Sequence, residues 1–288
     1  MVKTHNLTVN KDHGYHSNKY SFSEIKNALS NSQPNAYNKR FIEQSLGKKY
    51  DDYWILNWDE GIVAADAHSP FIHEKIFNLM LEVAHRYKIK NFLHAGDFWN
   101  QDQFSSFWIS KEDLISFSDE VSHSKKVVKS LTDNFNDVRF FLGSHDTRFW
   151  KLLYSIGKAD EYNTVWDLLE NKKIKTSNYR YCELNETWRI NHPKNTVKVG
   201  GLPAIRMNAK FGKSIIFGHG HWQGFVFAPD GKHVLMAPGC LVDPERISYR
   251  SLWDTSHDQW VPGFVMIVEK SKFIIFNENS PYGIYLKK

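Results

Sequence analysis

Five short segments of this chain place a histidine or an aspartate directly after an apolar, β-prone run of residues. They are Asp66-Ala67-His68, Gly96-Asp97, Gly143-Ser144-His145-Asp146, Asn191-His192-Pro193 and Gly218-His219-Gly220-His221. In an open α/β sheet, the loops at the carboxyl ends of the strands converge on one crevice, so side chains far apart along the chain are expected to meet there. Carboxylate and imidazole groups together suit Mn²⁺, Fe or Zn²⁺. The segments therefore predict a metal site.

Asp97 is the candidate for a ligand shared by two cations, because one carboxylate can offer an oxygen to each. The glycines at positions 96, 143, 218 and 220 would let the backbone approach the site closely. A single histidine at a strand end is more often a hydrogen-bonded structural residue than a ligand. Four histidines outside the five segments are interpreted as structural or solvent-facing for that reason: His73, His85, His94 and His123.

The chain from residue 55 onward alternates apolar, β-prone runs with segments of helical period, a pattern typical of a sheet with helical crossovers. Strands are expected at residues 61–65, 91–94, 138–142, 188–191 and 214–217, and helices at residues 72–87, 112–135 and 203–211. Residues 233–237, 263–269 and 272–277 are strand-like and would form hairpins that complete a second sheet. We therefore expect an α/β catalytic domain over residues 55–288.

Residues 1–54 differ from the rest because they are polar and rich in Asn, Ser and Lys. Short helices are expected at residues 21–29 and 37–46. We interpret this region as a polar, helical N-terminal extension. A small nucleic-acid-binding element is the alternative, although no basic recognition helix stands out.

Composition sets outer limits on the function. With 288 residues and 41% hydrophobic content, the chain can build a sizeable core. No apolar run approaches the ~18 residues of a membrane span, so no membrane association is expected. Two cysteines predict no disulfide framework and favour a cytoplasmic protein. The net charge of +5 is compatible with a polyanionic substrate, but an ordinary surface explains it equally well.

The ordered segments resemble the signature of the calcineurin-like metallophosphoesterase superfamily over roughly residues 58–288. Further segments are similar to phosphoesterases encoded in bacteriophage genomes. They are His192-Pro193-Lys194, Gly239-Cys240-Leu241-Val242-Asp243, Gly263-Phe264 after Trp260, and His145-Asp146 with Arg148. The resemblance implies a two-sheet β-sandwich flanked by helices. It also implies a host-cytoplasmic location if the chain is phage-encoded.

The resemblance further implies two divalent metal ions, with Mn²⁺ preferred and Fe, Zn²⁺, Ni²⁺ or Co²⁺ as alternatives. One ion would be held by Asp66, His68, Asp97 and His221, and the other by Asp97, Ser144, His192 and His219. A hydroxide shared by the two ions would attack phosphorus, His145 would act as the general acid, and Asp146 would orient the His145 ring.

Two positions depart from the pattern of the superfamily. Ser144 stands where Asn is usual, and its shorter, neutral hydroxyl is a weaker metal donor than an amide carbonyl. We therefore expect a weakened but present second metal site. Asn100 stands where many relatives have Asp, at a position that usually supports the ligands.

The substrate class is the least determined part of the sequence. A phosphodiesterase or nuclease acting on nucleic acid or nucleotides is the leading hypothesis, with Arg148 and Lys194 as candidate phosphate contacts. Either cation could instead form a structural ion pair. Five aromatic residues near the segments could stack on bases or pack in the core: Phe98, Trp99, Phe149, Trp150 and Trp222.

Two alternative functions stay open. One is a phosphomonoesterase or protein phosphatase. The other is a catalytically weakened metal- or nucleic-acid-binding homologue, which Ser144 makes worth testing. No obligate protein partner is evident.

Overall fold

The computed structural model describes residues 53–106, 109, 114–157, 165–194, 202–247 and 260–279. The expected extension over residues 1–54, with its two helices and its alternative role in nucleic-acid binding, therefore lies almost wholly outside the described residues. The domain boundary at residue 55 stays a prediction. No helix in the described ranges is both long and apolar enough to cross a membrane.

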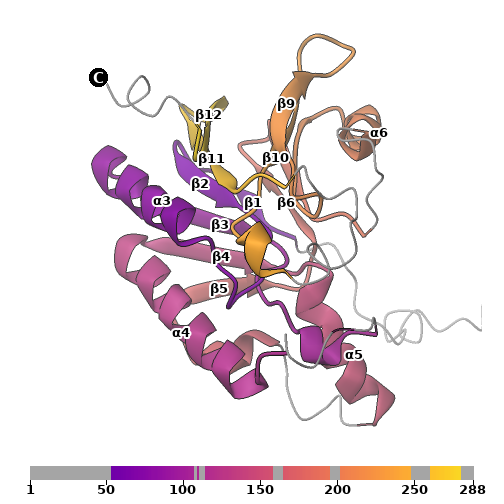
Figure 1. The fold of residues 1–288 in the computed structure, drawn as a ribbon. Helices are drawn as coiled ribbons and strands as arrows, with labels where there is room; N and C mark the ends of the chain where they lie inside the picture. Colours follow the sequence, from indigo (N-terminus) through magenta and orange to yellow (C-terminus); the bar gives the residue numbers. More distant parts are fainter. Residues whose placement is uncertain are drawn as a thin grey trace, which may run out of the picture. The chain divides into compact units, whose positions relative to one another are not determined.

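Two mixed sheets of six strands form the framework of the described chain (Figure 1). The first sheet runs in the order β1 (Ile55–Leu56), β6 (Tyr181–Leu184), β7 (Trp188–Asn191), β8 (Ser214–Phe217), β10 (Val234–Pro238) and β9 (Gln223–Phe227). The second runs in the order β12 (Lys272–Asn277), β11 (Gly263–Val268), β2 (Gly61–Ala64), β3 (Asn91–Ala95), β4 (Asp137–Phe141) and β5 (Ile174–Ser177). Strands β2 to β5 are parallel, as are β7, β8 and β10.

The sheets pack face to face because successive side chains of each strand point to opposite faces. In β2, Val63 lies in the core between the two sheets, where it joins Ile190 and Ile216 of the facing sheet. Its neighbour Ile62 points the other way, into the core beneath the helices. The continuous apolar runs seen in the sequence are thus strands that are buried on both faces.

Helices cover the outer faces. The helices α3 (Glu74–Tyr87) and α4 (Phe117–Asn134) lie over the sheet that contains β2 to β5 (Figure 1). Helix α6 (Leu202–Phe211) packs on β8 and β10 of the other sheet. This confirms the predicted α/β sandwich flanked by helices. The short helix α5 (Arg148–Ser155) follows β4 and the 3₁₀ turn His145–Thr147.

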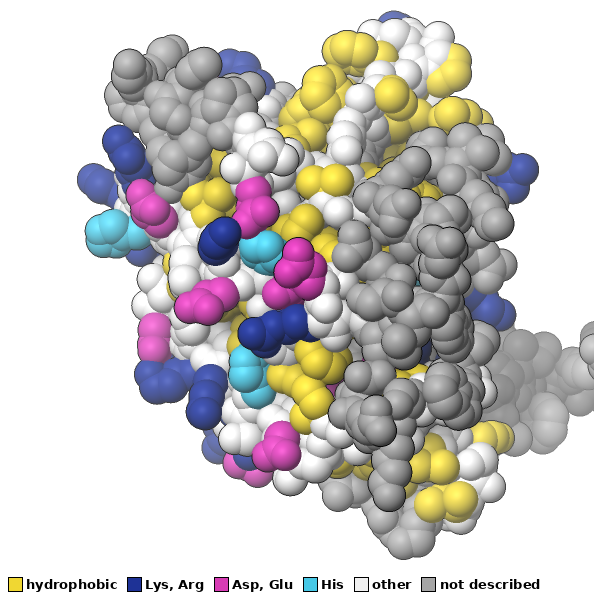
Figure 2. All heavy atoms as spheres, viewed as in Figure 1, with side chains coloured by type: hydrophobic (Ala, Val, Ile, Leu, Met, Phe, Trp, Pro, Cys, Tyr) yellow, Lys and Arg dark blue, Asp and Glu magenta, His cyan; other side chains and the backbone are white. Residues whose placement is uncertain are grey.

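Charges are mixed on the face shown in Figure 2, where Lys and Arg side chains are interspersed with Asp and Glu side chains among the described residues. The described residues of this face therefore carry no large patch of a single sign.

Candidate metal centre

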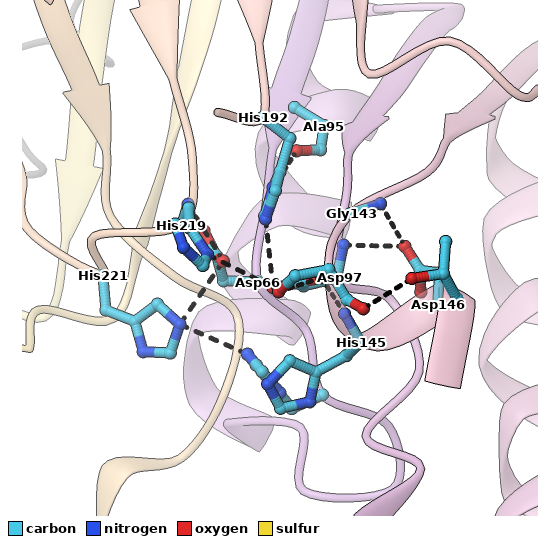
Figure 3. Close-up of polar contacts among 12 residues, drawn as sticks. Asp66, Ala95, Asp97, Gly143, His145, Asp146, His192, His219 and His221 are labelled. Atoms are coloured by element: carbon cyan, nitrogen blue, oxygen red, sulfur yellow. Dashed lines mark hydrogen bonds and ion pairs between the residues drawn. The ribbon is translucent and has the colours of Figure 1, made fainter. Parts of the chain in front are cut away.

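The five predicted segments come together at one edge of the sandwich (Figure 3). The carboxyl ends of β2 and β3 are joined by a hydrogen bond from the Asp66 amide to the Gly96 carbonyl (3.0 Å), and those of β7 and β8 by one from the Gly218 amide to the Asn191 carbonyl (3.0 Å). The two sheets are linked where the His219 amide donates to both oxygens of the Asp66 carboxylate (3.0 and 2.8 Å). The parallel strand ends thus deliver their loops to a common place, as expected.

Three overlapping groups of side chains could each hold a cation, their ligand atoms lying within 4.8 Å of one another. The groups are Asp66 with Asp97, His192 and His219; Asp66 with His68 and His221; and His68 with Asp97 and His145. The two carboxylates are nearly inaccessible to solvent, with exposed fractions of 0% for Asp66 and 1% for Asp97. Because each carboxylate occurs in two groups, the arrangement suits two neighbouring cations that share ligands.

The spacing of the donor atoms fits metal coordination. Two nitrogen or oxygen donors on one tetrahedral Zn²⁺ lie about 3.3 Å apart, given bond lengths of about 2.0–2.1 Å. The Nε2 atoms of His68 and His221 are 3.2 Å apart, and His221 Nε2 is 3.3 Å from Asp66 Oδ1. Around Asp97 Oδ2, His192 Nε2 lies at 3.0 Å and His219 Nδ1 at 3.6 Å. These separations match the edges of a coordination polyhedron.

The tautomer of His192 gives a second test of the fit. Its Nδ1 lies 2.9 Å from the Ala95 carbonyl, which can only accept, so Nδ1 carries the hydrogen. A neutral ring then directs the lone pair of Nε2 at the Asp97 carboxylate, and no described residue donates a hydrogen bond to the buried Nε2 atom. Two acceptors facing each other require a proton or a cation between them. Metal-ligating histidines commonly bond a backbone carbonyl through the other nitrogen in this way.

The electrostatics of the metal-free site agree with this requirement. Burial opposes ionisation of Asp97, but the charges of His192 and His145 overcome it and hold the Asp97 pKa well below its usual range. Burial would lower the pKa of His192, but the Asp97 carboxylate raises it to about 9. A proton on His192 thus occupies the place that the geometry offers to a metal. Burial and the neighbouring His145 and His221 keep the pKa of His68 well below its usual value, so this ring is neutral and available as a ligand.

Five of the candidate ligands have a backbone in the left-handed region. They are Asp66 (φ 54°), His68 (φ 44°), Asp97 (φ 55°), His219 (φ 78°) and His221 (φ 58°). Non-glycine residues adopt this region in only a few per cent of cases, and such conformations cluster at functional sites. Each of these turns aims a side chain back toward the strand ends, which a regular extended backbone would not do.

Two of the predicted glycines are required by close approach. A Cβ on Gly96 would lie 2.6 Å from the His192 ring, and one on Gly143 would collide with the Asp97 carboxylate and amide. Any side chain at these positions would displace a candidate ligand.

His145 lies beside the candidate ligands, with its ring centroid 4.3 Å from that of His68 and its amide donating to Asp97 Oδ1 (2.7 Å). Burial lowers the pKa of His145 to about 4, with Arg148 adding to the effect. The expected contact between Asp146 and this ring is absent from the described residues, so that role was wrong. Asp146 is buried and accepts hydrogen bonds from the amides of Asp97, Trp99 and Gly143 (2.9, 2.9 and 2.6 Å).

Asp146 therefore fixes the backbone of two ligand loops, and the His145 ring is held by other groups. Its Nδ1 lies 2.8 Å from the Asn100 carbonyl and its Nε2 lies 2.9 Å from Arg148 Nη2. The contact with Asn100 could not be read from the segment around His145, since a backbone carbonyl has no signature in the sequence.

Ser144 lies beside the shared carboxylate, and its hydroxyl donates to Asp97 Oδ2 (3.0 Å). It is thus close enough to belong to the centre, and its role as a ligand stays a prediction. Of the candidate phosphate contacts, Lys194 is exposed, whereas Arg148 is partly buried and hydrogen-bonded to His145.

The aromatic residues divide into two kinds. Phe98, Trp99 and Phe149 are buried, with exposed fractions of 1%, 0% and 9%, so they pack in the interior and cannot stack on a base. Trp150 and Trp222 are partly exposed. Trp260, which the sequence did not single out for the site, lies with its ring 3.9 Å from that of His221.

No protein-family profile matches the chain, and no curated protein sequence matches it. Among solved structures it is similar to Vps29 of Entamoeba histolytica in complex with Zn²⁺ (14% identity, 75% of this chain, 89% of that chain, TM-score 0.38). It is also similar to Vacuolar Protein Sorting 29 of Cryptosporidium parvum (10% identity, 77% and 92% coverage, TM-score 0.41) and to the nuclease MPE of Pseudomonas putida (11% identity, 75% and 87% coverage, TM-score 0.33). All three TM-scores are below 0.5.

Proposed function

We propose that this protein is a metal-dependent phosphoester hydrolase that works with two divalent cations, with Mn²⁺ preferred. The observation that carries the proposal is the donor set around Asp97, whose carboxylate has imidazoles of His192 and His219 on one side and lies in a second group with His68. Such a shared carboxylate between two histidine groups is the arrangement that two-metal hydrolases need. Membership of the calcineurin-like superfamily, and of its bacteriophage-type branch, rests on the sequence segments.

The residues divide between two cation positions. Asp66, His68, Asp97 and His221 would hold one ion, and Asp97, Ser144, His192 and His219 the other. When bound, the pair of cations activates a water for attack and neutralises charge on the phosphoryl oxygens. The carbonyl of Ala95 fixes the orientation of His192, and the amide of His145 fixes Asp97, so the protein supplies the ligands already aimed.

His145 is proposed as the general acid. Its ring is partly exposed, lies against His68, and is held at Nδ1 by the Asn100 carbonyl and at Nε2 by Arg148, so Nε2 would have to exchange Arg148 for the leaving oxygen of the substrate. Proton transfer from a positioned imidazole contributes about 10²–10⁴-fold to a rate. Asp146 acts on the same step by holding the loop that carries His145.

A phosphodiester of nucleic acid or a nucleotide is the proposed substrate class, and a phosphomonoester is the alternative. The hydrolase is tested with bis-p-nitrophenyl phosphate and p-nitrophenyl phosphate, each with Mn²⁺ and with chelator. Faster turnover of the diester, lost with chelator, supports the proposal, and faster turnover of the monoester favours the alternative. A cytoplasmic location stays a prediction of the sequence.

Two variants separate metal binding from chemistry. His145→Ala is expected to retain both metal equivalents by elemental analysis and to lose about 10²–10⁴-fold in rate. Asp97→Asn is expected to lose metal and rate together. Full activity of His145→Ala would show that the acid role is misassigned.

A binding protein without turnover is the second candidate, and the contact of the Ser144 hydroxyl with Asp97 Oδ2 favours it, because that hydroxyl is engaged by a carboxylate. Metal titration of the natural protein beside Ser144→Asn tests it. Two bound metals with no hydrolysis of either ester, restored by Ser144→Asn, would identify a weakened enzyme. Equal occupancy of both proteins would contradict the weakened second site.

A further inference from the structure

Arg148 makes an uncommon contact for a cation, since it donates to a histidine of the site. Its Nη2 lies 2.9 Å from His145 Nε2, and its Nη1 donates to the Asn100 carbonyl (3.0 Å) and to Asp102 Oδ1 (2.7 Å). Both members of the Arg148–Asp102 pair are largely buried, with exposed fractions of 16% and 13%. Arg148 is the first residue of α5, so helix and ion pair together fix its position.

The hydrogen atoms in this network can be assigned. The Asn100 carbonyl accepts from His145 Nδ1 at 2.8 Å, so the hydrogen of the ring is on Nδ1. Nε2 of the neutral ring therefore carries a lone pair, and Arg148 donates to it. In this state His145 has no hydrogen on Nε2 to give to a leaving group.

The guanidinium keeps unused donors beside the proposed centre. Of its five N–H groups, the two on Nη1 and one on Nη2 meet the three contacts described. Nε–H and the second Nη2–H have no acceptor among the described residues, and donors on adjacent nitrogens match two oxygens of a phosphate. A phosphate is also a far better acceptor for a cation than a neutral imidazole.

From this geometry we propose that Arg148 is a phosphate-binding residue that exchanges His145 Nε2 for a phosphoryl oxygen when substrate binds. Asp102 is the positioning residue that holds Arg148 through the exchange. Binding of the phosphoryl group then releases Nε2 of His145 from Arg148, so recognition of substrate and exposure of this nitrogen are coupled. The inference rests on the proposed function, because it assumes a phosphoryl group between Arg148 and the metal centre.

Binding of inorganic phosphate to the Mn²⁺-loaded protein tests the proposal without turnover. Arg148→Gln is expected to weaken phosphate binding at least tenfold, because a hydrogen bond to a charged group contributes about 1.5–3 kcal/mol and about 1.4 kcal/mol is tenfold. Asp102→Asn should weaken it at least threefold, and Arg148→Lys, which keeps the charge and loses the fork, should lie between natural protein and Arg148→Gln. All three should keep their metal content.

Arg139→Gln is the matched control. Arg139 pairs with Asp137 at 2.9 Å, and both have exposed fractions of 16%, so the pair resembles Arg148 with Asp102 but lies on β4. This control should bind phosphate within twofold of the natural protein. If Arg148→Gln and Arg148→Lys also do so, with full metal content, the proposal is overturned.

A nitrogen NMR measurement separates phosphate binding from a structural role. In the Zn²⁺-loaded natural protein, phosphate should change the chemical shift of His145 Nε2. In Arg148→Gln this chemical shift should already differ from that of the natural protein, and phosphate should not change it further. An unchanged Nε2 resonance in the natural protein at saturating phosphate would refute the exchange. If phosphate binding depends on Arg148 but no ester is hydrolysed, the role of Arg148 is supported and the proposed function is refuted. If esters are hydrolysed but phosphate binding does not depend on Arg148, the proposed function is supported and the role of Arg148 is refuted.

Discussion

His94 is a buried histidine whose ring nitrogens lack hydrogen-bond partners among the described residues, and replacing it with phenylalanine should increase the stability of the fold. Its exposed fraction is 1%, and neither ring nitrogen has a hydrogen-bond partner within the described part of the chain. The ring packs against Phe98 and Phe140, with centroids 5.4 and 5.6 Å away. A buried polar atom without a partner costs about 1–3 kcal/mol. His94→Phe is therefore expected to raise the free energy of unfolding at pH 7.5 by about 1–3 kcal/mol.

The same substitution should change how stability depends on pH. Burial lowers the pKa of His94 to about 3, from an ordinary value of 6.5. Below pH 6.5 His94 binds a proton in the unfolded chain and stays neutral in the folded chain, so the free energy of unfolding decreases as the pH falls. Between pH 7.5 and pH 5 this linkage amounts to about 2 kcal/mol. The advantage of His94→Phe over the natural protein should grow by that amount.

Urea unfolding of the metal-free protein in chelator at the two pH values measures both effects. Phe140→Leu is the control, because it disturbs the same packing and removes no titrating group. Its difference from the natural protein should be the same at both pH values. A His94→Phe difference that changes by less than about 0.5 kcal/mol between the two pH values would refute the reasoning.

Two further perturbations follow from buried contacts. Gly143→Ala should lower metal occupancy and cost about 1–3 kcal/mol by overpacking, measured by elemental analysis and urea unfolding. Gly157→Ala is the control, because no atom lies within 4 Å of the added Cβ, and it should keep full metal content. A loss of metal in this control would refute the steric explanation for Gly143→Ala. Burial raises the pKa of Glu120 to about 8, so the folded chain keeps a proton that the unfolded chain loses near pH 4.5, and stability falls as the pH rises. Glu120→Gln should therefore gain about 3 kcal/mol relative to the natural protein between pH 5 and pH 7.5 in urea unfolding, and a constant difference would contradict the buried proton.

The sequence was informative where one physical constraint dominates. The runs that became β2 and β8 are nearly continuous in apolar residues because both faces are covered, and such runs were recognisable as strands. β3, β4 and β7 were recognised from shorter apolar runs that include polar residues such as Arg139 and Arg189. Parallel strand ends share an edge, which is why residues as distant as Asp66 and His221 could be expected in one place.

Other elements carried no such signal. β9 lies at the edge of its sheet and exposes Phe225, Val226 and Phe227, with fractions of 50%, 53% and 67%, so its apolar residues do not mark a buried face. β5 and β6 are short and mix polar with apolar residues, and neither was expected. Their place is set by pairing with β4 and β7, which is a property of the whole sheet.

The site shows the same division. Ligand types and order were readable from side chains, whereas the partner of the His145 ring is the carbonyl of Asn100, and every residue has a carbonyl. The left-handed backbone at Asp66 and His68 could not be predicted either, since aspartate and histidine adopt that region more often than most residues but usually do not. Asp146 was recognised as important and given the wrong partner, because adjacency in sequence to His145 suggested a contact that the 3₁₀ turn directs elsewhere.

The placement of Asp97 explains why a serine is compatible with position 144. Asp97 Oδ1 is held by the His145 amide at 2.7 Å, and Oδ2 receives the Ser144 hydroxyl at 3.0 Å while facing His192. A hydroxyl can donate its hydrogen to the shared carboxylate and still present a lone pair to a cation, although it is a weaker metal donor than the carbonyl of an asparagine. The natural protein should therefore hold its second metal more weakly than Ser144→Asn, which a metal titration of the two proteins measures.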